Sequence, residues 1–518
     1  MFTKNYESEK NMKKEIQLDQ NGKRKFGMLD KVAYAAGDLG CNMSFGLKGT
    51  VQTFWLAYMM LETGLLSILL LLVQIWDAIN DPIIGAIIDA DRRKYKMGKF
   101  KTYIFIGACG LIIGGAAVFL PFPGADTWVK AVLFILGYII WDAAYTMANV
   151  PYGSMLSLVT TDAGERAQLS TWRSIGSMFG NILPNVILPM LIWHKVVDAS
   201  GNPVINPETG VQEQVLLGDR VFWAALLMGL IGFAAFFFMI KKITIRVDEN
   251  SVSTSEGGAK FNVIKAFANF MRNRPAVGAT LAAMGMFLGM QSATTASTIM
   301  FATYFGMAEL SGLVQAIGFA PMFLFIPFIK KLVDKFGKKE AAVAGTLVSL
   351  FGGLFMLVFP LVSDKTISLV LFVAGLCIFG VGMGVYTCVS WAMMADAIDY
   401  NEWKFGTREE GTVYSLHSFF RKLAQGIGPS AVIAIMGLLG YVADLGTGGQ
   451  SAETAYNMCW LVAGLYLFSG ICQFVGIAVI YNLDKKTLAK MSADLGRDVE
   501  ADDQFIATTI EDNDTPLA

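Results

Sequence analysis

Long apolar stretches, separated by short polar segments, run through almost the whole chain. Each stretch is long enough to cross a bilayer as a helix, which takes about 20 residues. Several are longer, which indicates tilted helices or helices that extend beyond the bilayer. About twelve can be delimited, at 31–59, 62–90, 102–121, 128–159, 168–193, 217–240, 276–305, 310–330, 339–361, 367–396, 412–440 and 455–482. The pattern predicts an all-α membrane protein with twelve transmembrane helices.

The connections between these stretches differ in charge. Six Lys and Arg residues lie in the segment DRRKYKMGKFK after the second stretch, seven in 241–275 and five in KKLVDKFGKK after the eighth. Connections on the other side carry only Lys130, Lys195, Arg220 and Lys365. Because basic loops stay in the cytoplasm, both termini are expected there. The connection from His194 to Arg220 is then an extracytoplasmic loop, with turn signals at Gly-Asn-Pro and Glu-Thr-Gly.

Composition agrees with a membrane protein and excludes several functions. The chain of 518 residues is 54% hydrophobic and only 16% charged, whereas soluble domains have about 25% charged residues. The net charge of −1 indicates no nucleic-acid partner, and the six scattered cysteines are interpreted as small apolar residues. No Walker sequence, paired Cys/His metal set or nucleophile elbow occurs, so we expect no enzyme and no cofactor.

The sequence around one basic connection recurs six stretches later. Asp-Arg-Arg followed by Gly98-Lys99 resembles the segment from Asp334 to Lys339. The offset predicts two six-helix halves, 29–240 and 276–483, joined by a cytoplasmic linker, 241–275. The polar segments 1–28 and 484–518 are expected to be cytoplasmic tails, because the first lacks the apolar core of a signal peptide. This layout is typical of a major facilitator transporter, whose substrate site lies between the halves.

Two aspartates lie one helical turn apart within the second apolar stretch. Asp77 and Asp81 are four residues apart, so their carboxylates share one helix face. A carboxylate at bilayer depth costs at least ~2.5–3.5 kcal/mol, and two close together repel. One interpretation is a site for a monovalent cation such as Na⁺ or H⁺. The alternative is a pair of ion pairs with a neighbouring helix.

Polar residues also follow one face of the fourth stretch. Asp142, Thr146 and Asn149 are spaced by four and three residues, and Asn149 precedes the helix-bending Pro151. Their oxygens suit a hard cation, although hydrogen bonding between helices would use the same groups.

Further buried charges lie in the first and fifth stretches. Asp38 and Asn42 share a face in the first stretch, and Asp38 either binds substrate or pairs with Lys48 or Lys422. Trp172 and Arg173 combine an aromatic ring with a forked hydrogen-bond donor, which suits a sugar. The alternative is a Trp at the membrane interface beside an Arg whose charged end reaches the headgroups.

The remaining polar candidates lie in the tenth and eleventh stretches. Arg421 and Lys422 could neutralise the aspartates or bind substrate oxygens, whereas His417 is interpreted as a neutral hydrogen-bonding residue. Asp396 and Asp399, at the cytoplasmic boundary, are candidates for a gate that pairs with basic loops, or are solvated helix-end charges.

Five strings in order resemble the glycoside–pentoside–hexuronide:cation symporter family, from about Lys31 to Asp484. They are KVAYAAGDLG, IWDAINDPIIGAIID, YTMANVPYGSM, MADAIDYNEWKFGTREEG and TVYSLHSFFRKL. The resemblance implies a major facilitator fold and import of a sugar by symport with Na⁺, H⁺ or Li⁺. It further implies a cation site at Asp77, Asn80, Asp81 and Thr146, a sugar-binding Arg173, and Lys422 near both sites.

The chain departs from melibiose permease, the best-known member of that family, at two positions. Asn42 and Asn149 stand where that protein has acids, so the resemblance points to the pentoside, xyloside or glucuronide branches. Our hypothesis is that Asp142, seven residues before Asn149, replaces part of the missing charge. The expected substrate set is Asp38, Asn42, Asp142, Trp172, Arg173 and Lys422, and Asn149 joins the cation set.

The sequence therefore predicts a monomeric sugar–cation symporter of the plasma membrane. Two alternatives remain open, a carrier of an amphipathic or lipid-like substrate and a membrane sensor without flux. The expected partners are a sugar, a coupling cation and the lipid bilayer.

Overall fold

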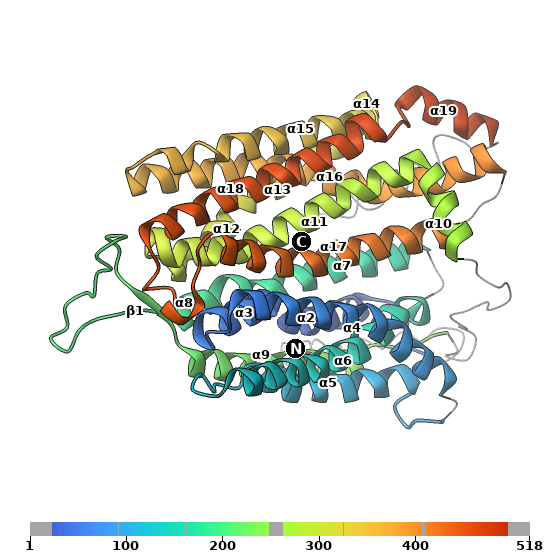
Figure 1. Cartoon of the computed structure of the whole chain (residues 1–518). Helices are drawn as coiled ribbons and strands as arrows, with labels where there is room; N and C mark the ends of the chain where they lie inside the picture. Colours follow the sequence, from blue (N-terminus) through green and yellow to red (C-terminus); the bar gives the residue numbers. More distant parts are fainter. Residues whose placement is uncertain are drawn as a thin grey trace, which may run out of the picture.

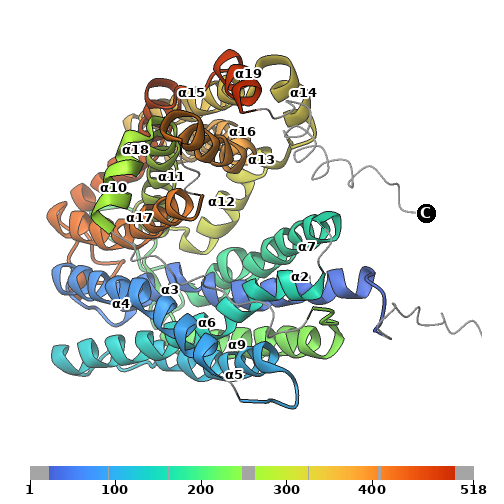
Figure 2. The same ribbon diagram turned by 90° about the vertical axis from the view of Figure 1, so that its right-hand side faces the viewer.

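The computed structural model describes residues 23–91, 93–160, 163–247, 263–324, 326–406 and 410–495. These residues form two groups of helices that lie side by side (Figures 1 and 2). Most of the two predicted tails and much of the linker lie outside the described residues.

The first group, which we call the N half, extends from α2 to α9. Its members are α2 (Met28–Phe45), α3 (Lys48–Thr53), η1 (Phe54–Tyr58), α4 (Thr63–Ala90), α5 (Lys99–Val118), α6 (Thr127–Val159), α7 (Ala163–Ile182), η2 (Leu183–Ile187), α8 (Leu188–Ile192), β1 (Trp193–Lys195), β2 (Gln214–Leu216) and α9 (Gly218–Lys242).

The second group, the C half, extends from α10 to α19. Its members are α10 (Val263–Arg272), α11 (Arg274–Met300), η3 (Phe301–Phe305), η4 (Ala308–Leu310), α12 (Ser311–Phe319), α13 (Pro321–Leu324), α14 (Ile326–Phe336), α15 (Lys338–Met356), η5 (Phe359–Leu361), α16 (Lys365–Phe405), α17 (Glu410–Leu438), η6 (Ala443–Leu445), α18 (Ala452–Phe474), η7 (Val475–Ile480) and α19 (Lys485–Asp494).

Within the described residues, nine helices are long and apolar enough to cross a membrane. They coincide with nine of the expected stretches, and the exceptions are 31–59, 310–330 and 412–440. The first is interrupted between α2 and α3, the second is divided among α12, α13 and α14, and the third contains Arg421 and Lys422. The all-helical class is confirmed, whereas the count of twelve spans stays a prediction.

Glycines on α5 bring α6 close enough to present its polar face to α4. A Cβ atom at Gly107 would lie 2.6 Å from the Ala148 nitrogen, and one at Gly114 would lie 2.6 Å from the Trp141 Cα. Small residues allow such close backbone contact between membrane helices. The two glycines therefore hold α6 in the position from which Asp142 and Thr146 reach α4.

The expected extracytoplasmic loop forms a β-hairpin at one end of the bundle, seen on the left of Figure 1. Strands β1 and β2 pair antiparallel, with Trp193 opposite Leu216 and Lys195 opposite Gln214. We call this end of the molecule the hairpin face and the opposite end, where α9 ends, the linker face.

The hairpin joins the two halves at the hairpin face. The Gln214 side chain is fully buried, donates to the Gly306 carbonyl at 2.8 Å and to Glu309 Oε2 at 2.6 Å, and accepts from the Ala308 amide at 2.5 Å. Lys195 pairs with Glu309 at 3.1 Å. The hairpin face is thus closed by polar contacts across the halves.

Candidate functional site

The two aspartates of α4 lie at the boundary between the halves, where each contacts a lysine. Lys48 Nζ of α3 lies 3.3 Å from Asp77 Oδ2. Lys422 of α17 donates to Asp81 Oδ2, which makes an ion pair between the two halves. All four side chains line one cavity of about 380 Å³. The pair is therefore open to a ligand and is neutralised in this conformation by one lysine from each half.

Asn80 and Thr146 connect these aspartates to α6. Asn80 Nδ2 donates to Asp142 Oδ2 at 3.1 Å and to Thr146 Oγ1 at 2.9 Å, and Thr146 Oγ1 donates to Asp81 Oδ1 at 2.9 Å. Asn80, Asp142 and Thr146 are only 1–2% exposed. The chain of hydrogen bonds places a third carboxylate, that of Asp142, behind the pair.

The predicted cation residues are thus largely brought together, with one exception. Asn149 lines the same cavity, but its described contact is with Cys41, whose Sγ lies 3.6 Å from Asn149 Oδ1. Among the described residues no group of three or more His, Cys, Asp or Glu could hold a metal ion. A cation here would need hydroxyl or amide oxygens besides the aspartates.

Three of the predicted substrate residues, Asp38, Asn42 and Arg173, form a separate cluster that links α2 to α7. Asp142 and Lys422 lie instead in the aspartate cluster. Arg173 Nε pairs with Asp38 Oδ1 at 2.9 Å, and Asn42 Nδ2 donates to Asp38 Oδ2 at 2.9 Å. Asn181 Nδ2 donates to Asn42 Oδ1 at 2.9 Å. Asp38 therefore pairs with Arg173, a partner that sequence reasoning did not consider, and not with Lys48 or Lys422.

Not every candidate reaches the central cavities. The described residues that line the two cavities do not include Trp172, Arg173, Asp38 or Asp142. A substrate role for these four residues stays a prediction. The guanidinium of Arg173 lies 5.2 Å from the ring centre of Tyr152 and pairs with Asp38.

A second cavity of about 420 Å³ adjoins the first and is lined only by uncharged residues among those described. The two cavities share Asn181, Asn185, Gln291 and Thr294. These amide and hydroxyl groups come from η2, α7 and α11 and were not singled out in the sequence. Their signal was weak, because polar residues in membrane helices also serve helix packing.

The gate candidates on α16 lie within the C half. Asp396 is 3% exposed and pairs with Lys338, the first residue of α15, at 3.1 Å. Lys338 belongs to the basic connection that the sequence suggested as a partner. The role of Asp396 and Asp399 as a gate stays a prediction.

The chain resembles known transporters along most of its length. Residues 33–485 match the family described as MFS/sugar transport protein. An uncharacterized symporter of Bacillus subtilis, YjmB, is 28% identical over 91% of this chain and 96% of its own. A glucuronide carrier protein homolog of Escherichia coli is 28% identical over 80% of this chain and 84% of its own.

A solved structure has the same fold. The crystal structure of the nucleoside transporter NupG superposes with a TM-score of 0.54 at 15% identity, covering 88% of this chain and all of that chain. At this identity the likeness concerns the fold alone.

Proposed function

Because the chain belongs to the MFS/sugar transport protein family, we propose that it moves a sugar across the membrane by symport with one monovalent cation, Na⁺ or H⁺. The observation that carries the proposal is the pair Asp77 and Asp81, which faces the cavity between the halves and is held by two lysines. Both carboxylates are available to a cation that displaces a lysine.

The charges of the cluster support a stoichiometry of one cation. The cluster contains three carboxylates, on Asp77, Asp81 and Asp142, and two ammonium groups, on Lys48 and Lys422. When all are ionised, the cluster has one excess negative charge. Net charge is costly at bilayer depth, so one Na⁺, or one proton on any of the three acids, makes the loaded site neutral.

Asp81 supplies the link between cation binding and movement of the halves. It is bonded to Thr146 in the N half and to Lys422 in the C half. By alternating access, the halves would move between an arrangement open at the hairpin face and one open at the linker face. A cation that takes the place of the lysine ammonium removes an ion pair across the boundary and changes the relative stability of these two arrangements. Cation and sugar then promote each other's binding reciprocally.

The uncharged cavity is the proposed sugar site. Asn181, Asn185, Gln291 and Gln315 line it with groups that both donate and accept hydrogen bonds, as sugar hydroxyls require. Because it shares its lining with the cavity that contains Asp77 and Asp81, a bound sugar would lie beside the cation.

Charge balance favours a neutral glycoside or pentoside over a hexuronide. A neutral sugar leaves the cation-loaded cluster neutral, whereas a carboxylate on the substrate adds a negative charge and requires a second cation. The glucuronide carrier homolog among the relatives makes hexuronides the competing class.

The direct test is sugar uptake by vesicles that contain the purified protein, under an imposed Na⁺ or H⁺ gradient. We expect at least one neutral glycoside or pentoside to accumulate under one of the two gradients. This accumulation should be lost when an ionophore dissipates the gradient. Uptake that is indifferent to both gradients would refute coupling, and accumulation of hexuronides alone would refute the neutral substrate.

Asp142→Asn tests whether the buried acid belongs to the coupling site. Without that carboxylate the cluster is neutral before the cation binds, so cation binding loses part of its electrostatic driving force. We expect the apparent cation affinity for uptake to fall about tenfold, which is ~1.4 kcal/mol. Unchanged uptake and cation response would sink the idea. Ser170→Ala on α7, whose exposed hydroxyl donates to the Arg166 carbonyl of the same helix, serves as the control.

Gln214→Ala tests the proposed alternation between two arrangements, because the hairpin contacts must break when the hairpin face opens. A lost hydrogen bond that leaves a buried group unpaired costs ~1–3 kcal/mol, so the open population is expected to rise about tenfold. The measure is the reaction rate of Thr53→Cys, at a position that lines the uncharged cavity, with an impermeant thiol reagent added from the hairpin side.

Gln212→Ala is the matched control for Gln214→Ala. Its side chain donates to the Val196 carbonyl within the same hairpin, so the contacts across the halves remain. Equal labelling rates in the two variants would contradict a closing role of Gln214.

A further inference from the structure

A third cavity lies at the linker face of the N half, away from the proposed transport site. It has a volume of about 720 Å³ and lies between the start of α5 and residues 243–247, which follow α9. Four basic side chains and no acidic one line it among the described residues, namely Lys23, Lys96, Lys101 and Arg246. A cavity of this charge fits an anion.

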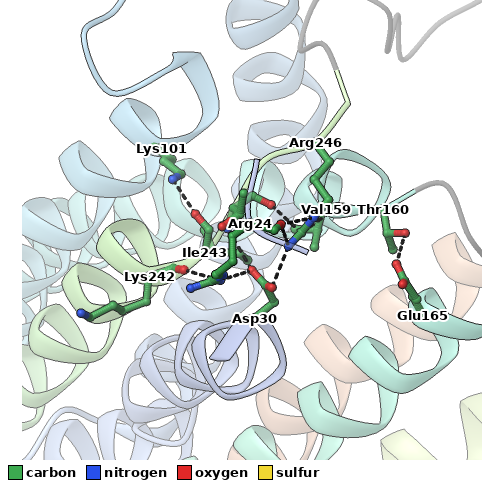
Figure 3. A network of polar contacts seen from close by, with 10 residues as sticks. Arg24, Asp30, Lys101, Val159, Thr160, Glu165, Lys242, Ile243 and Arg246 are labelled. Carbon is green, nitrogen blue, oxygen red and sulfur yellow. Dashed lines mark hydrogen bonds and ion pairs between the residues drawn. The ribbon is translucent and has the colours of Figure 1, made fainter. Parts of the chain in front are cut away.

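The walls of this cavity are fixed by hydrogen bonds (Figure 3). Lys101 Nζ donates to the Ile243 carbonyl at 2.9 Å and Lys23 Nζ donates to the Ile245 carbonyl at 3.0 Å. Arg246 pairs with the fully buried Asp30 at 2.8 Å and donates to the Val159 carbonyl at 3.2 Å. Asp30 also pairs with Arg24, so its one negative charge does not balance the four positive charges of the lining.

The backbone adds to the positive potential. Gly98 precedes α5 with a left-handed φ of 89°, no side chain caps this helix end, and its first turn contains no acid. The positive end of the helix dipole therefore lies at the cavity, which Gly98 and Lys101 both line.

The C half contains the same helix start with the opposite charge. Gly337 precedes α15 with a φ of 106°, and Glu340 lies three residues after it, in the first turn. In the N half the residue three positions after Gly98 is Lys101. The C half thus provides its own carboxylate where the N half provides an ammonium group.

We propose that this cavity binds a phosphate group, and that the ligand supplies the negative charge that Glu340 supplies in the C half. Phosphate oxygens accept hydrogen bonds from ammonium, guanidinium and backbone N–H groups alike. Because α5 and α9 are membrane spans that meet the cavity at their ends, it lies at the depth of lipid headgroups, where basic pockets bind anionic lipids. The phosphate belongs to an anionic phospholipid or is a free anion, and this inference does not depend on the proposed transport function.

The test is binding of phosphatidylglycerol by the purified full chain in phosphatidylcholine nanodiscs, followed by native mass spectrometry. Inorganic phosphate, titrated against the same protein in a thermal-shift assay, forms the second arm. Saturable binding in the first arm alone assigns the lipid, and saturable binding in the second arm assigns the free anion. Saturable binding in neither would overturn the proposal.

Charge reversal locates the binding. Lys101→Glu places an acid where the C half has Glu340, and Lys96→Glu changes an exposed residue of the turn before α5. We expect each to weaken binding by at least about fivefold, since a single basic residue near the surface contributes about that factor. Lys101→Arg should retain binding.

Lys335→Glu, at the exposed end of α14, is the matched control in the other half and should bind like the parent. Equal weakening by Lys335→Glu and Lys96→Glu would overturn the assignment, because the attraction would then be spread over the whole linker face. Should Lys101→Glu fail to fold, Lys96→Glu decides the question alone.

Discussion

Asp77→Asn is expected to abolish cation-driven accumulation of sugar while leaving exchange of sugar across the membrane intact. The substitution removes one of three carboxylates and with it the excess negative charge that the coupling cation neutralises. Lys48 loses its partner at 3.3 Å, and the cluster becomes neutral without a cation. Because the coupling cation loses one of the two carboxylates proposed to bind it, we expect gradient-driven uptake to fall at least about 30-fold, which is ~2 kcal/mol.

Two measurements separate this loss of coupling from misfolding. Exchange of labelled for unlabelled sugar across vesicles with no cation gradient should persist within about threefold of the parent. Asp91→Asn, directly after the end of α4, is the control. A hydrogen bond from Tyr95 lowers the pKa of Asp91 to about 2 and keeps it ionised at neutral pH outside the span. Loss of exchange in Asp77→Asn, or loss of uptake in Asp91→Asn, would contradict the assignment.

Asp30→Ala is expected to be the most destabilising single substitution at the linker face. The Asp30 side chain is fully buried and pairs with Arg24 at 2.5 Å and Arg246 at 2.8 Å. It also accepts from the Thr244 amide at 3.1 Å. It therefore ties the chain before α2 to the segment after α9 (Figure 3). Its removal leaves two guanidinium groups without their carboxylate.

The expected loss is about 3 kcal/mol, at the low end of the range for broken buried pairs. The arginines are 25% and 12% exposed, so hydration recovers part of the energy. Thermal unfolding in detergent should show a midpoint lower by roughly 3–7 °C, the smaller shift for unfolding of the whole chain as one unit and the larger for unfolding of the N half alone.

Asp198→Ala supplies the comparison for Asp30→Ala. Asp198 accepts from the Ser200 and Asn202 amides within its own exposed turn, and its removal should shift the midpoint by no more than about 2 °C. Similar shifts in both variants would show that Asp30 does not have the stabilising role assigned to it.

The parts of the fold that could be predicted from the sequence are those with a local signal. Hydropathy over some 20 residues predicted nine stretches that coincide with long apolar helices. It predicted the helix bounds least well where charges, prolines or a break interrupt a stretch, as in 310–330. The spacing of Asp77 and Asp81 fixed their common face, because a helix turns by the same angle at every residue.

The partners of the charged residues could not be read from the chain. Lys48 was a candidate partner for Asp38, ten residues away, but lies against Asp77, whereas Asp38 pairs with Arg173, 135 residues away. Of the three aspartates that Lys422 could reach, it contacts Asp81, 341 residues away. Which pair forms depends on how each helix is rotated and on which neighbours it meets, and neither follows from the period of one helix.

A helical membrane protein with two acids on one face of its second long apolar stretch could be predicted from the amino-acid sequence. These properties depend on hydropathy and spacing within one segment. Helix packing, by contrast, is what brings a lysine from each half to the two acids, closes one face with a hairpin, and forms a cavity lined by basic residues at the other. Each of these needs segments far apart in the chain to lie within a few ångströms, and that proximity arises from packing.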